Sequence, residues 1–223
     1  MRKPQSLRAQ GLLAATMFTF IGSIVCQEEL LFLCRMTTRY DQYIYCFDAW
    51  FGQPSFYLGR LLDSHHWLLY PTIILYGLTP SVLVFLLIAY YITQPLVNAR
   101  ECLWTTILCL IPAPLLYLVV PVSGPIYAFP TFPSYAPVIH SPQIIHLTSP
   151  PNGVPSIHFT LALIVLYFTR KWKFGIVLGV LYVVSTFLST LGSGEHYIFD
   201  LFVAVPYAVL SIYLGQTSSS KTA

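Results

Sequence analysis

Two histidines and one aspartate are the residues of this sequence whose types and spacing favour chemistry. His196 and Asp200 are four residues apart at the start of an apolar stretch, a spacing that places both side chains on one face of a helix. An aspartate so placed accepts a hydrogen bond from one imidazole nitrogen and leaves the other nitrogen available as a nucleophile or base. His158, at the start of another apolar stretch, is then a candidate general acid. The alternative interpretation is a structural hydrogen bond at a helix end.

Groups that bind anions adjoin these residues. Pro155 suits the first turn of a helix, which would leave the N–H groups of residues 156–158 unpaired and able to bind an anion. Ser156 adds a hydroxyl, and the Gly-Ser-Gly turn at 192–194 offers further N–H groups. This pattern predicts a phosphate site made mainly of uncharged donors. Three arginines of the first loop are further candidates, for which contact with lipid headgroups is the favoured interpretation: Arg35, Arg39 and Arg60.

The two motifs that carry these residues resemble those of a known family. Pro-Ser-x-His at 155–158, followed by Ser-x6-His-x3-Asp at 189–200, is similar to the pattern of the type 2 phosphatidic acid phosphatase and haloperoxidase superfamily. Thr190 stands where that family usually has arginine. The segment 122–127 stands where its first motif, with a lysine and an Arg-Pro pair, is expected. The resemblance extends over most of residues 40–215.

Several details are similar to the inositol phosphorylceramide synthase branch of this superfamily. They are the Ser-Thr opening of the last motif, Gly-Pro-x-Tyr at 124–127, His-Tyr-x-x-Asp at 196–200, and Phe-Asp-Ala-Trp-Phe-Gly at 47–52. The resemblance implies a membrane enzyme of inositolphosphotransferase type that acts on a lipid phosphate.

The resemblance also implies a role for each site residue. His196 attacks phosphorus and forms a phosphohistidine, Asp200 orients His196, and His158 protonates the leaving oxygen and later activates the acceptor. Residues that would hold phosphoryl oxygens are Ser156, Ser189 and Gly194, and candidate substrate contacts are Tyr127 and Tyr197. Anchoring in the membrane interface is the alternative for both tyrosines. We expect neither a cofactor nor a metal, because the sequence has no carboxylate cluster or Cys/His spacing typical of metal ligands.

The composition indicates a membrane protein. Of the 223 residues, 56% are hydrophobic and 9% are charged, whereas a soluble domain carries about 25% charged residues. The net charge of +3 is the excess expected of cytoplasmic loops and requires no nucleic-acid partner.

The apolar stretches predict an all-α polytopic bundle with six transmembrane helices in a single domain, 1–223, whose catalytic core is about 120–215. The expected spans are about 11–34, 67–93, 102–120, 155–168, 174–191 and 196–214. We interpret the first as an uncleaved span, with a cleaved signal peptide as the alternative. The segment 121–154 is too polar and too rich in proline to cross a bilayer.

The positions of lysine and arginine predict the orientation of these spans. With both termini cytoplasmic, the cytoplasmic segments hold Arg2, Lys3, Arg8, Arg100, Arg170, Lys171, Lys173 and Lys221. The motifs around His158 and His196 then lie at the non-cytoplasmic face, which is periplasmic, extracellular or luminal.

We therefore predict an integral, multi-pass membrane enzyme that cleaves or transfers a phosphoryl group or phospho-headgroup. Its partners are a lipid phosphate substrate, an alcohol or water acceptor and membrane lipids, with no nucleic acid. Transfer to an alcohol is favoured, because Thr190 and the missing first motif remove cations that would bind a phosphate dianion. The alternatives are a lipid phosphate phosphatase that releases inorganic phosphate and a non-catalytic protein that binds a lipid headgroup.

Overall fold

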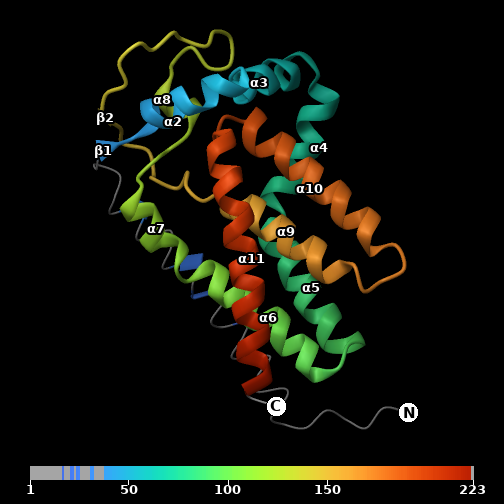
Figure 1. Ribbon diagram of the computed structural model, residues 1–223. Helices are drawn as coiled ribbons and strands as arrows, with labels where there is room; N and C mark the ends of the chain where they lie inside the picture. The colour runs from blue at the N-terminus through green and yellow to red at the C-terminus, as the bar shows by residue number, and fades with distance from the viewer. Residues whose placement is uncertain (1–16, 18–20, 23, 26–30, 33–37, 222–223) are drawn as a thin grey trace.

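The computed structural model describes residues 17, 21–22, 24–25, 31–32 and 38–221 and shows a helical bundle with a cap of short elements at one end (Figure 1). The bundle consists of α4 (His66–Gly77), α5 (Thr79–Thr93), α6 (Leu96–Leu110), α7 (Ala113–Val119), α9 (Ile157–Thr169), α10 (Gly175–Gly192) and α11 (Ile198–Lys221). The cap consists of β1 (Thr38–Arg39), α2 (Asp41–Asp48), η1 (Ala49–Phe51), α3 (Pro54–Ser64), α8 (Pro125–Ala128) and β2 (Ile145–His146).

Three stretches of helix are long and apolar enough to cross a membrane. They are Leu96–Val119, Gly175–Gly192 and Ile198–Ser220. The pair α4 and α5 makes a fourth if it counts as one span, and α9 is apolar but shorter. The protein is therefore an integral membrane protein that is mostly helical, as predicted. Of the six expected spans, the first, 11–34, lies mostly outside the residues that the structure describes.

The expected span 67–93 is broken into two helices. Its halves, α4 and α5, meet at an angle of 56°. Leu78 separates them, and Pro80 lies in the first turn of α5, where a missing N–H group is tolerated. The break falls beside this proline, whereas Pro71 lies inside α4.

Close packing of helices forms the bundle interior. Helix α11 packs along α6, and α10 packs along α9. A Cβ atom added to Gly215 of α11 would lie 2.8 Å from the backbone nitrogen of Thr105 in α6, so only glycine permits this approach. Small residues at helix contacts are typical of membrane bundles, where packing rather than the hydrophobic effect drives association. Large apolar side chains such as Val119 and Phe85 face outward.

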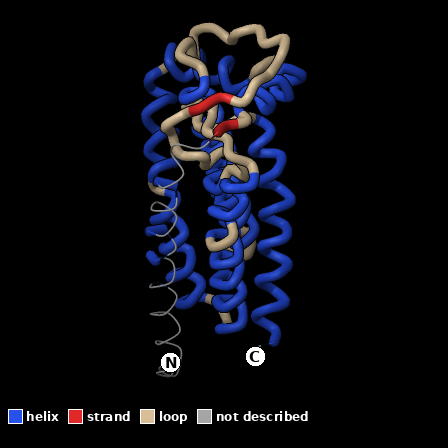
Figure 2. Tube along the Cα trace, turned by 90° about the vertical axis from the view of Figure 1, so that its left-hand side faces the viewer, coloured by secondary structure: helices blue, strands red, loops and turns tan. Residues whose placement is uncertain are grey.

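The cap includes the proline-rich segment 121–154, and Figure 2 shows long loops and the two strands together at one end of the helices. Strands β1 and β2 pair antiparallel, with Thr38 opposite His146. Arg39 is fully buried; its Nε donates to Ser123 Oγ at 2.8 Å, and another guanidinium nitrogen donates to the Ser149 carbonyl. Arg39 thereby connects both ends of this segment, and the interpretation that it contacts lipid headgroups was wrong.

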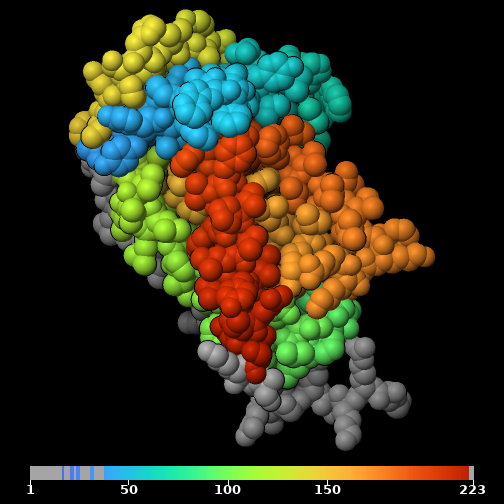
Figure 3. Space-filling view, viewed as in Figure 1, coloured from blue at the N-terminus to red at the C-terminus, as the bar shows by residue number. Residues whose placement is uncertain are grey.

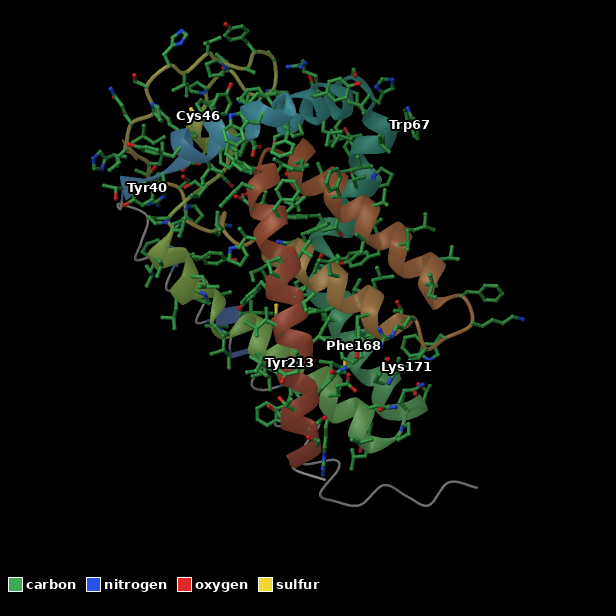
Figure 4. The ribbon with its side chains drawn as sticks, in the orientation of Figure 1. Tyr40, Cys46, Trp67, Phe168, Lys171 and Tyr213 are labelled. Atoms are coloured by element: carbon green, nitrogen blue, oxygen red, sulfur yellow. The ribbon has the colours of Figure 1, made fainter. Side chains whose placement is uncertain are left out.

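The cap covers the N-terminal end of α11. Figure 3 shows α2 and α3 lying against the start of α11, with the proline-rich segment above them. Figure 4 shows Cys46 and Trp67 at the cap end, whereas Lys171, in the turn between α9 and α10, lies away from it. Trp50 and Trp67 are 84% and 74% exposed, as expected of aromatic side chains at a membrane interface.

Candidate active site

His196 and Asp200 lie side by side at the start of α11. His196 is in the turn between α10 and α11, only 2% exposed, and Asp200 is in the first turn of α11. His196 Nδ1 lies 3.2 Å from Asp200 Oδ2 and 3.1 Å from the Gly153 carbonyl oxygen. A carbonyl oxygen only accepts hydrogen bonds, so Nδ1 carries the hydrogen and donates it to these partners. In the neutral ring, Nε2 then keeps its lone pair and is the nucleophilic or basic atom.

The backbone of His196 is held on both sides. Its N–H donates to the Thr190 carbonyl at 3.2 Å, and its carbonyl accepts a hydrogen bond from Ser55 Oγ at 2.9 Å. Ser55 lies in the first turn of α3, and nothing in the sequence motifs indicated its role. The turn that carries His196 is therefore attached both to its own helix pair and to the cap.

His158 lies in the first turn of α9, with its ring against Tyr76 of α4. The ring centroids are 3.9 Å apart and the planes are inclined by 22°, which is a stacked arrangement. The N–H of Ser156, two residues before His158, donates to the Asp200 carbonyl at 3.3 Å, so the start of α9 lies against the start of α11. The structure therefore brings the two histidines of the sequence motifs into one site, and Tyr76 orients one of them.

The start of α9 differs from the expected anion site in two respects. Pro155 precedes the N-cap residue and does not lie in the first turn of the helix. Ser156 is the N-cap residue, and its own N–H donates to the Asp200 carbonyl at 3.3 Å, so the expectation that this N–H is unpaired was wrong. The Ser156 hydroxyl oxygen accepts from the Phe159 N–H at 3.4 Å. Within the described part of the chain, the N–H groups of Ile157 and His158 have no acceptor. Two N–H groups, rather than three, remain at this helix end to bind an anion.

Ser189 and Gly194 both make structural contacts. Ser189 Oγ donates to the Thr72 carbonyl of α4 at 2.6 Å, which attaches α10 to α4. Gly194 has φ +77°, and its carbonyl accepts from the Ile126 N–H at 3.0 Å. A Cβ atom on Gly194 would lie 2.6 Å from the Phe132 ring. Binding of phosphoryl oxygens by these two residues stays a prediction.

The two candidate tyrosines have different environments. Tyr197 is fully buried, and its hydroxyl donates to Asp41 Oδ1 at 3.0 Å. Tyr127 is 38% exposed, and its hydroxyl lies 3.0 and 3.1 Å from the two carboxylate oxygens of Glu195. Partial burial, followed by the negative charge of Glu195, raises the pKa of Tyr127 to about 12. Of the two, only Tyr127 is accessible beside His196, together with Glu195.

Two buried carboxylates of α2 support the site and were missed from the sequence. Asp41 accepts from the N–H groups of Ser123 and Gly124, the latter at 2.8 Å. Burial raises the pKa of Asp41 to about 6, although these hydrogen bonds oppose the shift. Asp48 accepts from two N–H groups of α11, and burial raises its pKa to about 7. Their spacing of seven residues places both on one helix face, which is the signal that could have identified them.

The comparison with protein families agrees with this geometry. The model of the PAP2 superfamily matches residues 42–214, which include His158, His196 and Asp200. No curated protein and no solved structure matched the chain.

Proposed function

The chain belongs to the PAP2 superfamily, and we propose that it transfers the phospho-headgroup of a lipid to an alcohol through a phosphohistidine at His196. One observation carries this proposal: His196 Nδ1 donates its hydrogen to two acceptors, Asp200 Oδ2 and the Gly153 carbonyl oxygen. They fix the ring so that Nε2 is the reactive nitrogen. Membership of the superfamily supports phosphoryl chemistry at this nitrogen.

In the first step, Nε2 of His196 attacks phosphorus and the bond from phosphorus to the leaving oxygen breaks. His158 donates a proton to that oxygen, so the leaving group departs as an alcohol. The imidazole becomes positively charged as the N–P bond forms, and the Asp200 carboxylate and the Gly153 carbonyl stabilise that charge. In the second step, His158 takes a proton from the acceptor, whose oxygen attacks phosphorus and displaces His196.

The donors of the site suit a phosphate group of low charge. The N–H groups of Ile157 and His158 at the start of α9 are available to bind an anion, and the helix dipole favours such binding. Thr190 occupies the usual arginine position, and its hydroxyl donates to the Thr186 carbonyl at 2.8 Å. Charge-assisted hydrogen bonds are about twice as strong as neutral ones. A site that relies on neutral donors therefore favours a phosphodiester over a phosphate dianion, which agrees with the resemblance to the inositolphosphotransferase branch.

The proposed topology has six spans, both termini in the cytoplasm and the site on the non-cytoplasmic side. The basic turn 170–173, which lies away from the cap (Figure 4), supports this orientation. Cysteines introduced at exposed Tyr135 in the cap and at Lys173 in the turn should react with an impermeant reagent from opposite sides. Labelling of both positions from one side contradicts the topology.

A lipid phosphate phosphatase is the second candidate. Tyr127 and Glu195 are only partly buried beside His196, so water reaches this side of the site. Water as the acceptor in the second step would release inorganic phosphate from a lipid phosphomonoester and a phosphomonoester from a phosphodiester lipid.

The experiment that separates these functions follows the phosphate of a labelled phosphodiester lipid. The purified protein is incubated in chelator with this lipid, with and without ceramide, diacylglycerol or an inositol lipid as acceptor. The proposal predicts labelled product that requires an acceptor and is absent for His196→Gln. A labelled phosphomonoester formed without any acceptor, or release of inorganic phosphate from a labelled lipid phosphomonoester tested in parallel, indicates the phosphatase. The absence of any labelled product indicates a protein that only binds headgroups.

A further inference from the structure

Asp48 reaches from the cap to the start of the helix that carries the site. It is the last residue of α2 and is fully buried. Its Oδ2 accepts from the Ile198 N–H at 2.9 Å, and its Oδ1 accepts from the Phe199 N–H at 3.3 Å. The first N–H groups of a helix have no partner inside the helix. Asp48 therefore caps α11 from a helix that lies 150 positions earlier in the sequence.

Asp48 and Asp200 together accept three consecutive N–H groups. The N–H of Tyr197 donates to Asp200 Oδ2 at 2.9 Å, and those of Ile198 and Phe199 donate to Asp48. These three residues are the whole connection between His196 and Asp200. Asp200 Oδ2 is also the oxygen that contacts His196 Nδ1. The distance between the histidine and its carboxylate therefore depends on a short segment that Asp48 holds in place.

We propose that Asp48 is a positioning residue for His196 and Asp200, which acts by fixing the first turn of α11 and does not touch the substrate. The inference rests on the proposed function in one respect, which is that His196 is the reacting residue. Because a misplacement of about 1 Å lowers rates about 100-fold in enzymes, a partial loosening of this turn should reduce turnover without changing substrate affinity.

The charge of Asp48 determines how well it performs this role. An ionised carboxylate accepts both N–H groups, one on each oxygen, whereas a protonated carboxyl group accepts them poorly on its hydroxyl oxygen. The pKa of Asp48 is raised to about 7 by burial and, in smaller part, by the charge of Asp200, while the two hydrogen bonds oppose the shift. The other titratable groups that interact with Asp48 are Tyr45 on α2 and Tyr197 before α11. The positioning is therefore lost as the pH falls through about 7.

Folding and positioning favour opposite charge states of Asp48. A carboxyl group with a raised pKa stabilises the fold most at low pH, and this contribution is lost as the pH rises through the folded-state pKa. A neutral substitute should therefore not destabilise the protein at alkaline pH. This separates a positioning role from a purely structural role, in which removal of the carboxylate lowers stability and activity together.

The test compares Asp48→Asn in the full chain with Asp63→Asn as the control, since Asp63 is an exposed acidic residue of α3. For Asp48→Asn we expect kcat at pH 8 to fall roughly tenfold with KM unchanged. We also expect the decline of wild-type kcat below pH 7 to disappear in this variant. Its thermal midpoint at pH 8 should equal or exceed that of the wild type, and Asp63→Asn should match the wild type in kcat and KM.

A second readout does not depend on turnover. The rate at which diethyl pyrocarbonate modifies His196, measured by mass spectrometry of the peptide, should change in Asp48→Asn and remain unchanged in Asp63→Asn. If the modification rate changes in Asp48→Asn and not in Asp63→Asn while the wild type shows no turnover, the proposed function fails and the positioning role stands. The inference is overturned if Asp48→Asn has the same kcat as the wild type and the same rate of His196 modification. A loss of kcat that accompanies a lower thermal midpoint at pH 8 would also overturn it.

Discussion

The hydroxyl of Ser55 donates a hydrogen bond to the main-chain carbonyl of His196 at 2.9 Å, across 141 positions of the sequence. Both groups are buried, so neither has water as a substitute partner. This bond attaches α3 of the cap to the turn that presents His196. The cap is therefore part of the active-site architecture as well as a cover over the bundle.

Ser55→Ala should lower both stability and activity. Loss of the hydroxyl leaves the His196 carbonyl unpaired, at a cost of about 1–3 kcal/mol in stability, and frees the turn to move, so we expect kcat to fall several-fold. The control is Ser64→Ala, because Ser64 is exposed at the end of the same helix and bonds only to local carbonyls and a neighbouring histidine. Equal kcat values for the two variants would show that the Ser55 bond does not position His196.

Tyr76 should act through its ring rather than its hydroxyl. Tyr76→Phe keeps the stacked contact with His158 and should retain most of the activity, whereas Tyr76→Leu removes the flat surface and should lower kcat about tenfold. Steady-state kinetics on a labelled lipid measure both. If Tyr76→Phe is as impaired as Tyr76→Leu, then the hydroxyl matters and the stacking argument is wrong.

Gly194→Ala should be more damaging than Gly52→Ala. Both glycines have a positive φ, +77° and +76°, which costs a residue with a side chain about 1–2 kcal/mol. Only at Gly194 would the new Cβ atom meet other atoms, with Phe132 2.6 Å away, whereas nothing lies within 4 Å of it at Gly52. Overpacking adds about 1–3 kcal/mol. Thermal unfolding of both variants in detergent tests this difference, and equal midpoints would refute it.

Asp41 should make the protein less stable as the pH rises. Its pKa is raised to about 6, so the stability that it contributes is fully present below a pH of about 4 and is lost as the pH rises through 6. In Asp41→Asn the decline of the thermal midpoint between pH 4.5 and 7 should be smaller than in the wild type. Asp63→Asn again serves as the exposed control. An unchanged slope in Asp41→Asn would mean that Asp41 does not titrate in this range.

The relation between His196 and Asp200 could be predicted from the sequence because it is local. Residues four apart meet across one helical turn whatever the rest of the fold does. The predominance of helix was predictable from apolar stretches long enough to cross a bilayer. The superfamily was recognisable from two short motifs, and the family match over 42–214 confirms it.

Contacts between distant segments could not be predicted in the same way. Asp48 and Ile198 are 150 positions apart, and Ser55 and His196 are 141 apart, so no spacing rule connects them. The expectation for the Ser156 N–H failed for the same reason, because its acceptor is the Asp200 carbonyl on another helix. Arg39 was assigned to lipid headgroups as an arginine of the first loop, but hydrogen bonds to Ser123 and Ser149 offset the cost of its burial.

The central claim is that phosphorus becomes bonded to His196, and the most direct measurement is to trap that intermediate. The wild type is mixed briefly with a phosphate-labelled diester lipid, quenched in alkali, digested and analysed by mass spectrometry. The account predicts an alkali-stable, acid-labile phosphate on the peptide that contains His196, and none in His196→Gln. Turnover by the wild type with no labelled peptide under any quench, or label that persists in His196→Gln, would contradict it.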